Sequence, residues 1–391
     1  MQPKKITIIA DKSKIEGGAN IAAMRIANIL KKKFSINVIH PKKNITHFLK
    51  NFISKIIIKV FIGRTAFLNS LNIFDNIDTS NLKNEILNIH WIGKETISLD
   101  TLIKKKINII WTLHDMWPIT STEHFVYNSK IRKYSEKDLK KNFLKKKIFC
   151  KKKELFSSKK VILITCCKWL EDIVKRSDNT KKLYVKTIYN PIEIEIWKRK
   201  NKKLSKKKLK LDLKKNFILF GAHGGLSNPR KGGDQLIKSI EKIKDFLIKN
   251  NYEIIVLGGK KNYKENYNGV IYNFRKHESS KERQVLYHSV VDLTLSCARA
   301  EALPQFLVET ILCKNPVVSF NIGGIKEIVT HKKNGFLVDP FDINSFSKGI
   351  KFVIENKKNL SLKRNINFIK KEFSAKSVMK KYNEAIKKFT K

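Results

Sequence analysis

The sequence lacks the features that mark several common protein classes. Its five cysteines include no CxxC pair, which argues against a disulfide-stapled secreted fold or a thiolate zinc site and fits a reducing cytoplasm. No apolar run reaches the roughly 18 residues of a membrane span, because basic residues interrupt the stretch from Phe52 to Leu68. The apolar part of Lys4–Ala10 is too short for a signal peptide and instead predicts an opening β-strand.

Acidic residues are also scarce. The chain has 34 Asp and Glu against 82 Lys and Arg, a net charge of +48, and only ten of the basic residues are Arg. Nucleic-acid-binding proteins depend on Arg for bidentate contacts, and the excess is spread evenly, at +24 in residues 1–190 and +24 in residues 191–391. Both observations argue against nucleic acid as a partner. We interpret the Lys-rich clusters at 137–160 and 198–215 as solvated surfaces, with attraction to an anionic membrane surface as the alternative.

What the chain does contain is a repeated alternation of strands and helices. Short β-branched segments alternate with helical ones in two series, which predicts an α/β fold of two Rossmann-like, doubly wound domains. The predicted strands lie at 4–10, 36–40, 86–90, 107–113, 161–165 and 184–189, and then at 217–221, 253–258, 270–274, 291–296 and 316–320. A cleft between the carboxyl ends of the two sheets is the expected ligand site.

A length of 391 residues also favours two domains. We place the N-terminal domain at residues 1–195 and the C-terminal domain at residues 196–370. The remaining residues, 371–391, are expected to form a helix that packs back on the N-terminal domain.

Lysine is absent from five long windows, at 15–30, 60–82, 107–129, 216–230 and 282–313. Burial alone excludes lysine, yet four of these windows also contain Gly-rich turns, a His-Asp pair or isolated Glu residues. We therefore expect the chemistry of the protein in these windows.

Two of these features lie in the first half of the chain. Gly17 and Gly18 precede a predicted helix, where small residues let backbone N–H groups approach an anion, although a plain turn explains the pair equally well. His114 and Asp115 follow an apolar strand. A histidine there can donate to a sugar hydroxyl or a developing oxyanion, or it can be satisfied by local backbone.

The second half carries two sharper features. A Gly-rich loop, 221–233, contains Arg230 and Lys231 and leads into a helix, an arrangement suited to a phosphate or diphosphate. Glu301 precedes a predicted helix at 304–313, with Asn315 as its expected left-handed cap, and Glu309 lies inside that helix among apolar residues. A carboxylate in such a setting is either a site residue or half of a structural ion pair.

Glu301-x7-Glu309, within AEALPQFLVETILCKNPVVSFNIGGIKEIV, resembles the signature of retaining glycosyltransferases of family 4, which have the GT-B fold. Supporting motifs occur in order along nearly the whole chain: NIHWIG, WTLHDMWPIT, YNP, PRKG and NGFLVDP. The HW and WTLHD motifs are most similar to those of enzymes of bacterial exopolysaccharide and lipopolysaccharide assembly. The resemblance implies two Rossmann-like domains that face each other across a cleft.

By this resemblance, the donor is a nucleotide-diphosphate sugar. Glu309 would hold the donor ribose and Glu301 would contact the transferred sugar. The diphosphate would be neutralised by Arg230 and Lys231, with help from the backbone amides of Gln305 and Phe306.

In the first domain, Gly17 and Gly18 would bring backbone to the phosphate and His114 would meet the sugar near the reacting carbon. Glu301, His114 and Lys231 are thus the candidate catalytic residues. Many relatives carry Arg where this chain has Ala222, which leaves the number of phosphate contacts open.

The resemblance implies a hexosyltransferase-type enzyme that acts with retention on a hydroxyl of a glycan or lipid-linked glycan acceptor, in cell-surface polysaccharide synthesis. Such an enzyme would need no metal and no further cofactor, and the sequence contains no Asp-x-Asp motif. We expect it in the cytoplasm or at the inner face of the cell membrane. The alternative is a non-enzymatic basic protein that binds nucleic acid or a membrane, which a salt-dependent gel shift would test.

Overall fold

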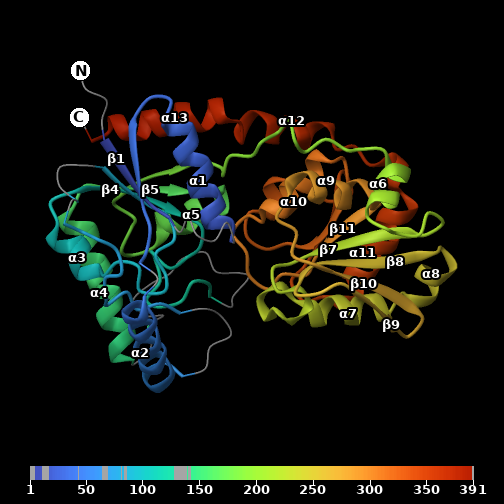
Figure 1. Cartoon of the computed structure of the whole chain (residues 1–391), viewed down its shortest axis with the longest axis horizontal. Helices are drawn as coiled ribbons and strands as arrows, with labels where there is room; N and C mark the ends of the chain where they lie inside the picture. Colours follow the sequence, from blue (N-terminus) through green and yellow to red (C-terminus); the bar gives the residue numbers. More distant parts are fainter. Residues whose placement is uncertain are drawn as a thin grey trace. The chain divides into compact units, whose positions relative to one another are not determined.

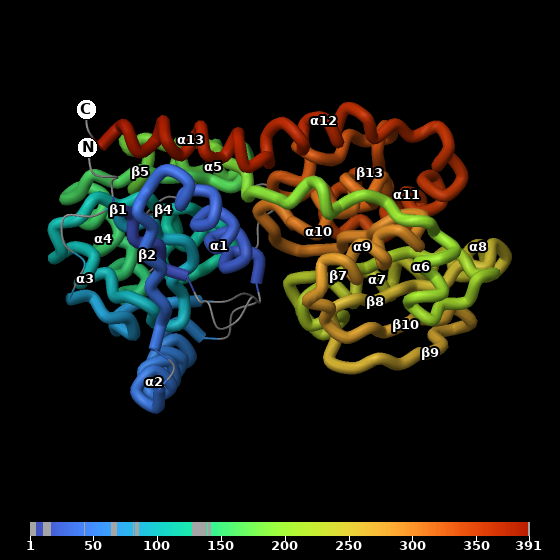
Figure 2. Tube along the Cα trace, turned by 45° about the horizontal axis from the view of Figure 1, so that its top comes forward, coloured from blue at the N-terminus to red at the C-terminus, as the bar shows by residue number. Residues whose placement is uncertain are grey.

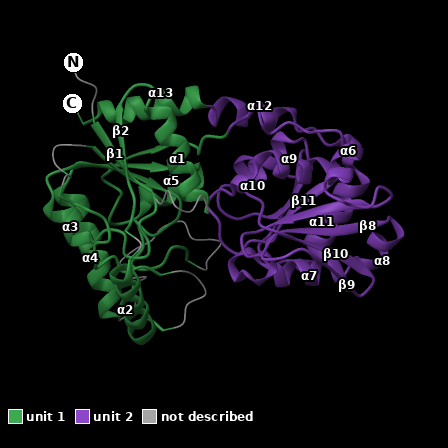
Figure 3. Cartoon of the chain, viewed as in Figure 1, with its two compact units in different colours: residues 1–192, 375–391 green, residues 193–374 purple. Residues whose placement is uncertain are grey.

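A computed structural model describes residues 5–10, 17–42, 44–63, 69–80, 82, 86–126, 139 and 142–389. The chain divides into two compact units, residues 1–192 with 375–391 and residues 193–374 (Figure 3). One unit holds a six-stranded sheet and the other a seven-stranded sheet. The α/β fold class predicted from the alternating segments is therefore confirmed.

The sheet of the first unit is parallel throughout, in the order β2-β1-β3-β4-β5-β6 (Figure 1). Its strands are β1 (Lys5–Ile9), β2 (Ser35–Ile39), β3 (Ile86–Ile89), β4 (Asn108–Leu113), β5 (Val161–Thr165) and β6 (Tyr184–Thr187). The helices of this unit are α1 (Gly18–Leu30), α2 (Ile45–Phe61), α3 (Leu99–Lys104), α4 (Phe143–Ser158), α5 (Lys168–Arg176) and α13 (Ala375–Lys387).

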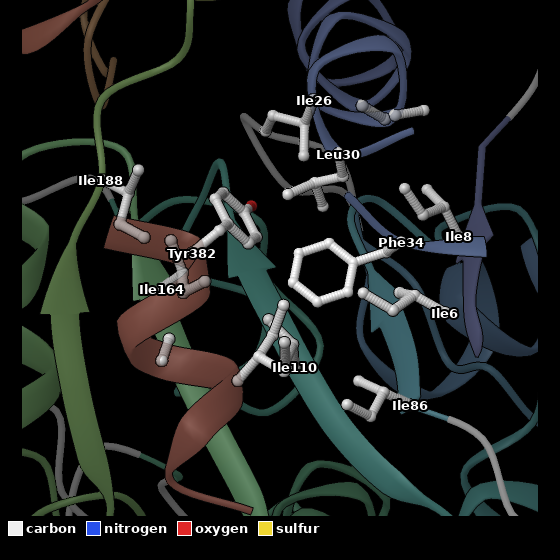
Figure 4. Packing of buried hydrophobic residues seen from close by; sticks show 14 of the residues in the cluster. Ile6, Ile8, Ile26, Leu30, Phe34, Ile86, Ile110, Ile164, Ile188 and Tyr382 are labelled. Atoms are coloured by element: carbon white, nitrogen blue, oxygen red, sulfur yellow. The ribbon is translucent and has the colours of Figure 1, made fainter. Parts of the chain in front are cut away.

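The last helix, α13, packs beside α1 over the first sheet (Figures 1 and 2). Its Tyr382 is fully buried and points into a cluster of Ile and Leu side chains from β1, β3, β4, β5 and α1, together with Phe34 from the turn after α1 (Figure 4). The Tyr382 hydroxyl lies 2.9 Å from Thr112 Oγ1 on β4, so this buried polar group is satisfied. The C-terminal segment therefore completes the core of the first unit.

The second unit has the strand order β13-β12-β11-β7-β8-β10-β9, and only β9 pairs antiparallel. Its strands are β7 (Asn216–Gly221), β8 (Tyr252–Gly259), β9 (Tyr263–Tyr267), β10 (Val270–Lys276), β11 (Leu293–Ser296), β12 (Val317–Phe320) and β13 (Gly335–Val338). Its helices are α6 (Lys202–Lys208), α7 (Gly233–Glu241), α8 (Lys244–Lys249), α9 (Lys281–Val290), α10 (Gln305–Leu312), α11 (Ile343–Glu355) and α12 (Lys363–Glu372).

The cap of α10 differs from the sequence expectation. Lys314, with φ 59°, takes the left-handed position that we had expected at Asn315. Asn315 is instead fully buried, and its side-chain amide donates to the backbone carbonyl of His288. The Asn315 amide thus connects the end of α10 to α9. Lys314, at the surface, adopts the left-handed conformation at a small cost in free energy.

Candidate active site

The second sheet reverses its strand order at β7. From β7 the chain proceeds to β8 on one side and later returns to place β11 on the other side. In open, doubly wound sheets, ligands bind at the carboxyl ends of the strands at such a switch point. Two loops leave these ends, residues 222–232 after β7 and residues 297–304 after β11. They carry the Arg-Lys pair and Glu301.

Glu301 joins the two loops through one carboxylate oxygen. Its Oε2 lies 2.8 Å from Arg230 Nη1 and 2.5 Å from Lys231 Nζ. Arg230 Nη1 also donates to the backbone carbonyl of Ala300 at 3.0 Å. The Glu301 side chain is only 13% exposed, against 18% for Lys231 and 29% for Arg230. Residues about 70 positions apart in sequence therefore form one compact charged cluster with a net positive charge.

Burial and charge act in opposite directions on this cluster. Burial alone would raise the pKa of Glu301, but Arg230 and Lys231 together lower that pKa to about 2. Burial lowers the pKa of Lys231 below its usual value, although Glu301 offsets part of the effect. Glu301 thus stays ionised and contacts both cations, Arg230 and Lys231, at once.

Close backbone approach fixes both loops. Gly232 has φ 71°, and a Cβ atom there would lie 1.9 Å from the carbonyl oxygen of Cys297. Gly323 has φ 55°, and a Cβ there would lie 2.0 Å from the carbonyl oxygen of Glu301. The next residue, Gly324, donates its N–H to Ala302 O at 2.6 Å. The loop after β12 therefore holds the backbone of Glu301 in place, and no side chain fits at either glycine.

Helix α10 begins beside this cluster. Pro304 is its N-cap, so the backbone N–H groups of Gln305 and Phe306 belong to the first turn, where helical donors have no intrahelical partner. The buried side-chain amide nitrogen of Gln305 has no hydrogen-bond partner among the described residues. Glu309, 8% exposed, lies one turn further along the same helix. The first turn of α10 thus offers donors to an anion and keeps a carboxylate nearby.

In the first unit, the switch point lies between β1 and β3. Gly17, with φ 99°, is the N-cap of α1, and Gly18 is its first residue. The loop that connects them to β1, residues 11–16, lies outside the described residues. His114 follows β4, the strand next to β3, and its Nε2 lies 2.9 Å from Nδ1 of His90 at the end of β3. Burial lowers the pKa of His90 well below its usual value, and His114 adds to the effect, so His90 is neutral at pH 7.

Sequence reasoning missed the buried network that supports His114. Asp115 Oδ2 accepts from His124 Nδ1 at 2.5 Å, and His124 Nε2 lies 2.9 Å from Ser70 Oγ. These three residues are all less than 10% exposed, so the network is structural and orders the turn after β4. The nearby placement of Asp115 and His124 within the Lys-free window was the signal that could have pointed to it.

Lys152 on α4 is a further residue that sequence reasoning did not select. It is fully buried, and its Nζ donates to the backbone carbonyls of Trp117, Thr120 and Ser121 at 2.5, 3.2 and 2.6 Å. The same ammonium lies 3.5 Å from the centre of the Trp117 ring. Burial lowers its pKa well below the usual value. Lys152 therefore fixes the turn that follows His114.

The candidate residues thus fall into two groups, each described within its own unit. Arg230, Lys231, Glu301, Gln305, Phe306 and Glu309 surround the carboxyl ends of β7 and β11 in the second unit. Gly17, Gly18 and His114 lie at the carboxyl edge of the first sheet.

Residues 201–371 match the family model described as "Glycosyl transferases group 1". The matched residues all lie within the second unit. An uncharacterised glycosyltransferase of Methanocaldococcus jannaschii is 31% identical over 163 residues, which cover 40% of this chain and 43% of that protein. A further uncharacterised glycosyltransferase, from Haemophilus influenzae, is 37% identical over 60 residues, or 15% of this chain and 17% of that protein. The matches thus span less than half the length of these relatives.

Solved structures resemble the whole chain. A sucrose-phosphate synthase from Thermosynechococcus elongatus matches with a TM-score of 0.71 at 12% identity and covers 99% of both chains. HepE of Anabaena, in complex with UDP and glucose, matches with a TM-score of 0.63 at 15% identity, over 98% of this chain and 99% of that one. At these identities the likeness establishes the fold alone, which is the GT-B fold.

Proposed function

We propose that the chain transfers a sugar from a nucleotide-diphosphate sugar to a hydroxyl of a glycan or lipid-linked glycan acceptor, with retention of anomeric configuration. The observation that supports this most directly is the convergence of Arg230 and Lys231 on Glu301 at the switch point of the second sheet. The proposed role of the chain is in the assembly of cell-surface polysaccharide, on the cytoplasmic side of the membrane.

The chemistry requires charge stabilisation above all. As the glycosidic bond breaks, negative charge grows on the nucleotide diphosphate, and donors that are already in place stabilise that charge without reorganisation. Arg230 and Lys231 supply fixed positive charge, and the first-turn amides of α10, those of Gln305 and Phe306, supply dipoles. We propose that these groups replace a divalent cation and that no other cofactor takes part.

The remaining roles follow from position. Glu309, next to the first turn of α10, would accept hydrogen bonds from the ribose hydroxyls, and Glu301 would orient the cations and contact the transferred sugar. Gly17 and Gly18 would bring backbone N–H groups to the phosphate, and His114 would contact a sugar hydroxyl. Retention follows if the acceptor hydroxyl attacks the face that the diphosphate leaves and gives its proton to the departing phosphate oxygen. The cleft expected between the two sheets remains a prediction.

The donor nucleotide is the first property to test. HepE, which shares the fold, was crystallised with UDP-glucose, so UDP is our first candidate. We would measure thermal stabilisation by UDP, GDP, ADP and CMP, since a ligand at 100 times its Kd adds about 2.7 kcal/mol to stability. One nucleoside diphosphate should stabilise the chain clearly more than the others. If none of the four did so at millimolar concentration, the proposed donor site would be wrong.

A non-enzymatic basic protein that binds nucleic acid is the alternative, and the net charge of +48 supports it. Binding to nucleic acid without sequence preference would weaken steeply as salt rises. A gel shift at two salt concentrations, set beside an assay with a UDP-sugar and a glycan acceptor, distinguishes the two functions.

A further inference from the structure

Helix α2 of the first unit presents its apolar side to solvent. Besides Phe61 at its C-terminal end, seven large apolar residues of this helix are between 44% and 79% exposed: Ile45, Phe48, Leu49, Phe52, Ile53, Ile56 and Val60. At about 3.6 residues per turn they occupy one continuous face, which we call the apolar face of α2. Helices of globular proteins normally bury such a face against the core. Figures 1 and 2 both show α2 standing clear of the β1–β6 sheet.

Polar contacts hold the opposite side of α2 against the protein. Ser54, 4% exposed, donates its hydroxyl to Glu95 Oε1 at 2.8 Å. Glu95 is itself buried and also accepts the backbone N–H of Asn72 at 3.0 Å and of Ile73 at 2.7 Å. Lys50 Nζ donates to the carbonyl of Asp75 at 2.7 Å. The helix is therefore fixed with its polar side inward, and the outward apolar face is a built feature of the fold.

The start of α4 extends this surface. Asn142 Nδ2 donates to the carbonyl of Phe61, the last residue of α2, at 2.6 Å. The next residue, Phe143, is 79% exposed. Exposed lysines accompany the apolar side chains, Lys55 and Lys59 on α2 and Lys146 and Lys147 on α4. Neither residues 44–63 nor residues 142–153 contain an Asp or Glu.

We propose that the apolar face of α2, together with Phe143, inserts into the interface of an anionic lipid bilayer. A helix with a wide apolar face bordered by lysines lies flat at the headgroup level, where the apolar side chains enter the acyl region and the ammonium groups reach the phosphates. Across the described residues, no helix combines the length and apolarity needed to cross a membrane. The binding is therefore in-plane, and it stands apart from the proposed sugar transfer.

Charge favours lipid over the other occupants of such a face. A second copy of this chain would bring a further net charge of +48 to a surface already bordered by lysines, and like charges oppose that contact. A negatively charged bilayer offers the complementary charge, and each lysine near it adds to the attraction. The face is also a convex helical ridge, a shape that a fluid interface accommodates without a matching groove.

Vesicle flotation with the full chain tests the apolar contribution. We expect the chain to float with vesicles that contain about one-third phosphatidylglycerol, and the double variant Phe48→Ser/Phe52→Ser to partition at least tenfold more weakly. The matched control is Leu204→Ser/Leu213→Ser, which removes two apolar side chains that are 58% and 44% exposed in the second unit. This control should float like the unmodified chain. If the α2 variant melted early, Ile45→Ser/Val60→Ser would carry the same test at the two ends of the face.

A charge-reversal pair tests the electrostatic contribution. Lys55→Glu/Lys59→Glu should weaken binding to the anionic vesicles by about tenfold. Lys207→Glu/Lys208→Glu, which changes the net charge equally on the exposed surface of α6, should have a much smaller effect.

Three results would overturn the proposal. Flotation of Phe48→Ser/Phe52→Ser equal to that of the unmodified chain would show that α2 does not insert. If both charge-reversal variants lost vesicle binding equally, the binding would depend on the net charge of the chain and not on the lysines of α2. If the unmodified chain sedimented as a dimer and the Phe48→Ser/Phe52→Ser variant as a monomer, the apolar face of α2 would be a contact with a second copy of the chain.

Discussion

The two units use the same architecture to build chemically different strand ends. In the second unit, the switch point of the sheet holds Arg230, Lys231 and Glu301 in direct contact. In the first unit, the corresponding edge holds the neutral His90 beside His114. One edge therefore offers fixed positive charge, which fits a diphosphate. The other offers imidazole nitrogens as hydrogen-bonding groups, which fits sugar hydroxyls.

The supports of the two edges differ in the same way. Glycines at 232 and 323 allow the loops of the second unit to touch through their backbones. The first unit instead relies on buried side chains. Lys152 donates hydrogen bonds to three backbone carbonyls of the turn that follows His114, and the Asp115 carboxylate orients His124. Backbone packing fixes the edge that holds Arg230 and Lys231, which we call the charged edge. A side-chain network fixes the edge that holds His90 and His114, which we call the neutral edge after His90.

The strongest test of the comparison removes a cation from the charged edge. Lys231→Ala should lower kcat by about 10²–10³-fold, because Lys231 is proposed to act on charge that grows in the transition state. Lys238→Ala is the matched control, since it removes the same charge from an exposed position one turn into α7. Steady-state kinetics on both variants would decide. Equal activity of the two variants would remove Lys231 from the proposed mechanism.

The two glutamates should separate nucleotide binding from turnover. Glu309→Gln should weaken binding of the nucleoside diphosphate by about 10–100-fold, the value of a lost charge-assisted contact. Glu301→Gln should leave that affinity unchanged or tighter, because the substitution releases Arg230 and Lys231 from their shared carboxylate, and should depress turnover. Calorimetry and a turnover assay on both variants test this. If both variants bound and turned over normally, the pair would be structural.

A substitution at the neutral edge should lower turnover without weakening nucleotide binding. His114→Ala should lower turnover by about tenfold or more, the value of a lost general hydrogen-bonding contact, while nucleotide affinity stays unchanged. His331→Ala, at an exposed imidazole of the second unit, is the control. A loss of nucleotide affinity in His114→Ala equal to the loss in turnover would contradict the division of roles between the edges.

Much of the fold could be predicted because most strands are buried on both faces and therefore read as continuous apolar runs. The predicted 161–165 strand coincides with β5. The pattern of residues 343–355 predicts a helix, which coincides with α11. The β9 strand, YKENY, was missed because it is a mostly exposed edge strand without apolar alternation. The pattern of residues 232–249 predicts one helix, but the structure has two, α7 and α8, with a break at residues 242–243.

The site was less accessible from sequence than the fold. The sequence singled out Glu301, Arg230 and Lys231, but spacing along the chain could not indicate that all three meet at one carboxylate oxygen. Lys152 is one of 72 lysines, and only the three-dimensional structure distinguishes it. The exposure of α2 was hidden for a related reason, since an apolar helical pattern normally indicates a buried face. In each case the missing information is which side of an element meets the rest of the chain.

Acid should destabilise the second unit through a buried histidine. Burial lowers the pKa of His288 from 6.5 to about 3. Between these pH values, His288 is protonated in the unfolded chain but not in the folded unit. Stability therefore falls as the pH drops from about 6.5 toward 3, by roughly 2 kcal/mol at pH 5. His288→Gln removes this contribution and should flatten the dependence. Urea unfolding at pH 7 and pH 5 tests it, and an equal loss in both proteins would contradict the assignment.

The smallest effect is expected from removal of metal. The charged edge supplies two cations, Arg230 and Lys231, and helix amides where a metal-dependent enzyme would place a divalent ion, so transfer activity should stay within about twofold after EDTA treatment. The comparison between the edges sharpens the experiment. If a divalent ion did act at the diphosphate, Lys231→Ala would be partly rescued by added Mg²⁺ or Mn²⁺ and His114→Ala would not. Activity that disappears with EDTA and returns only with one of these ions would show that the charged edge of the second unit is incomplete without a metal.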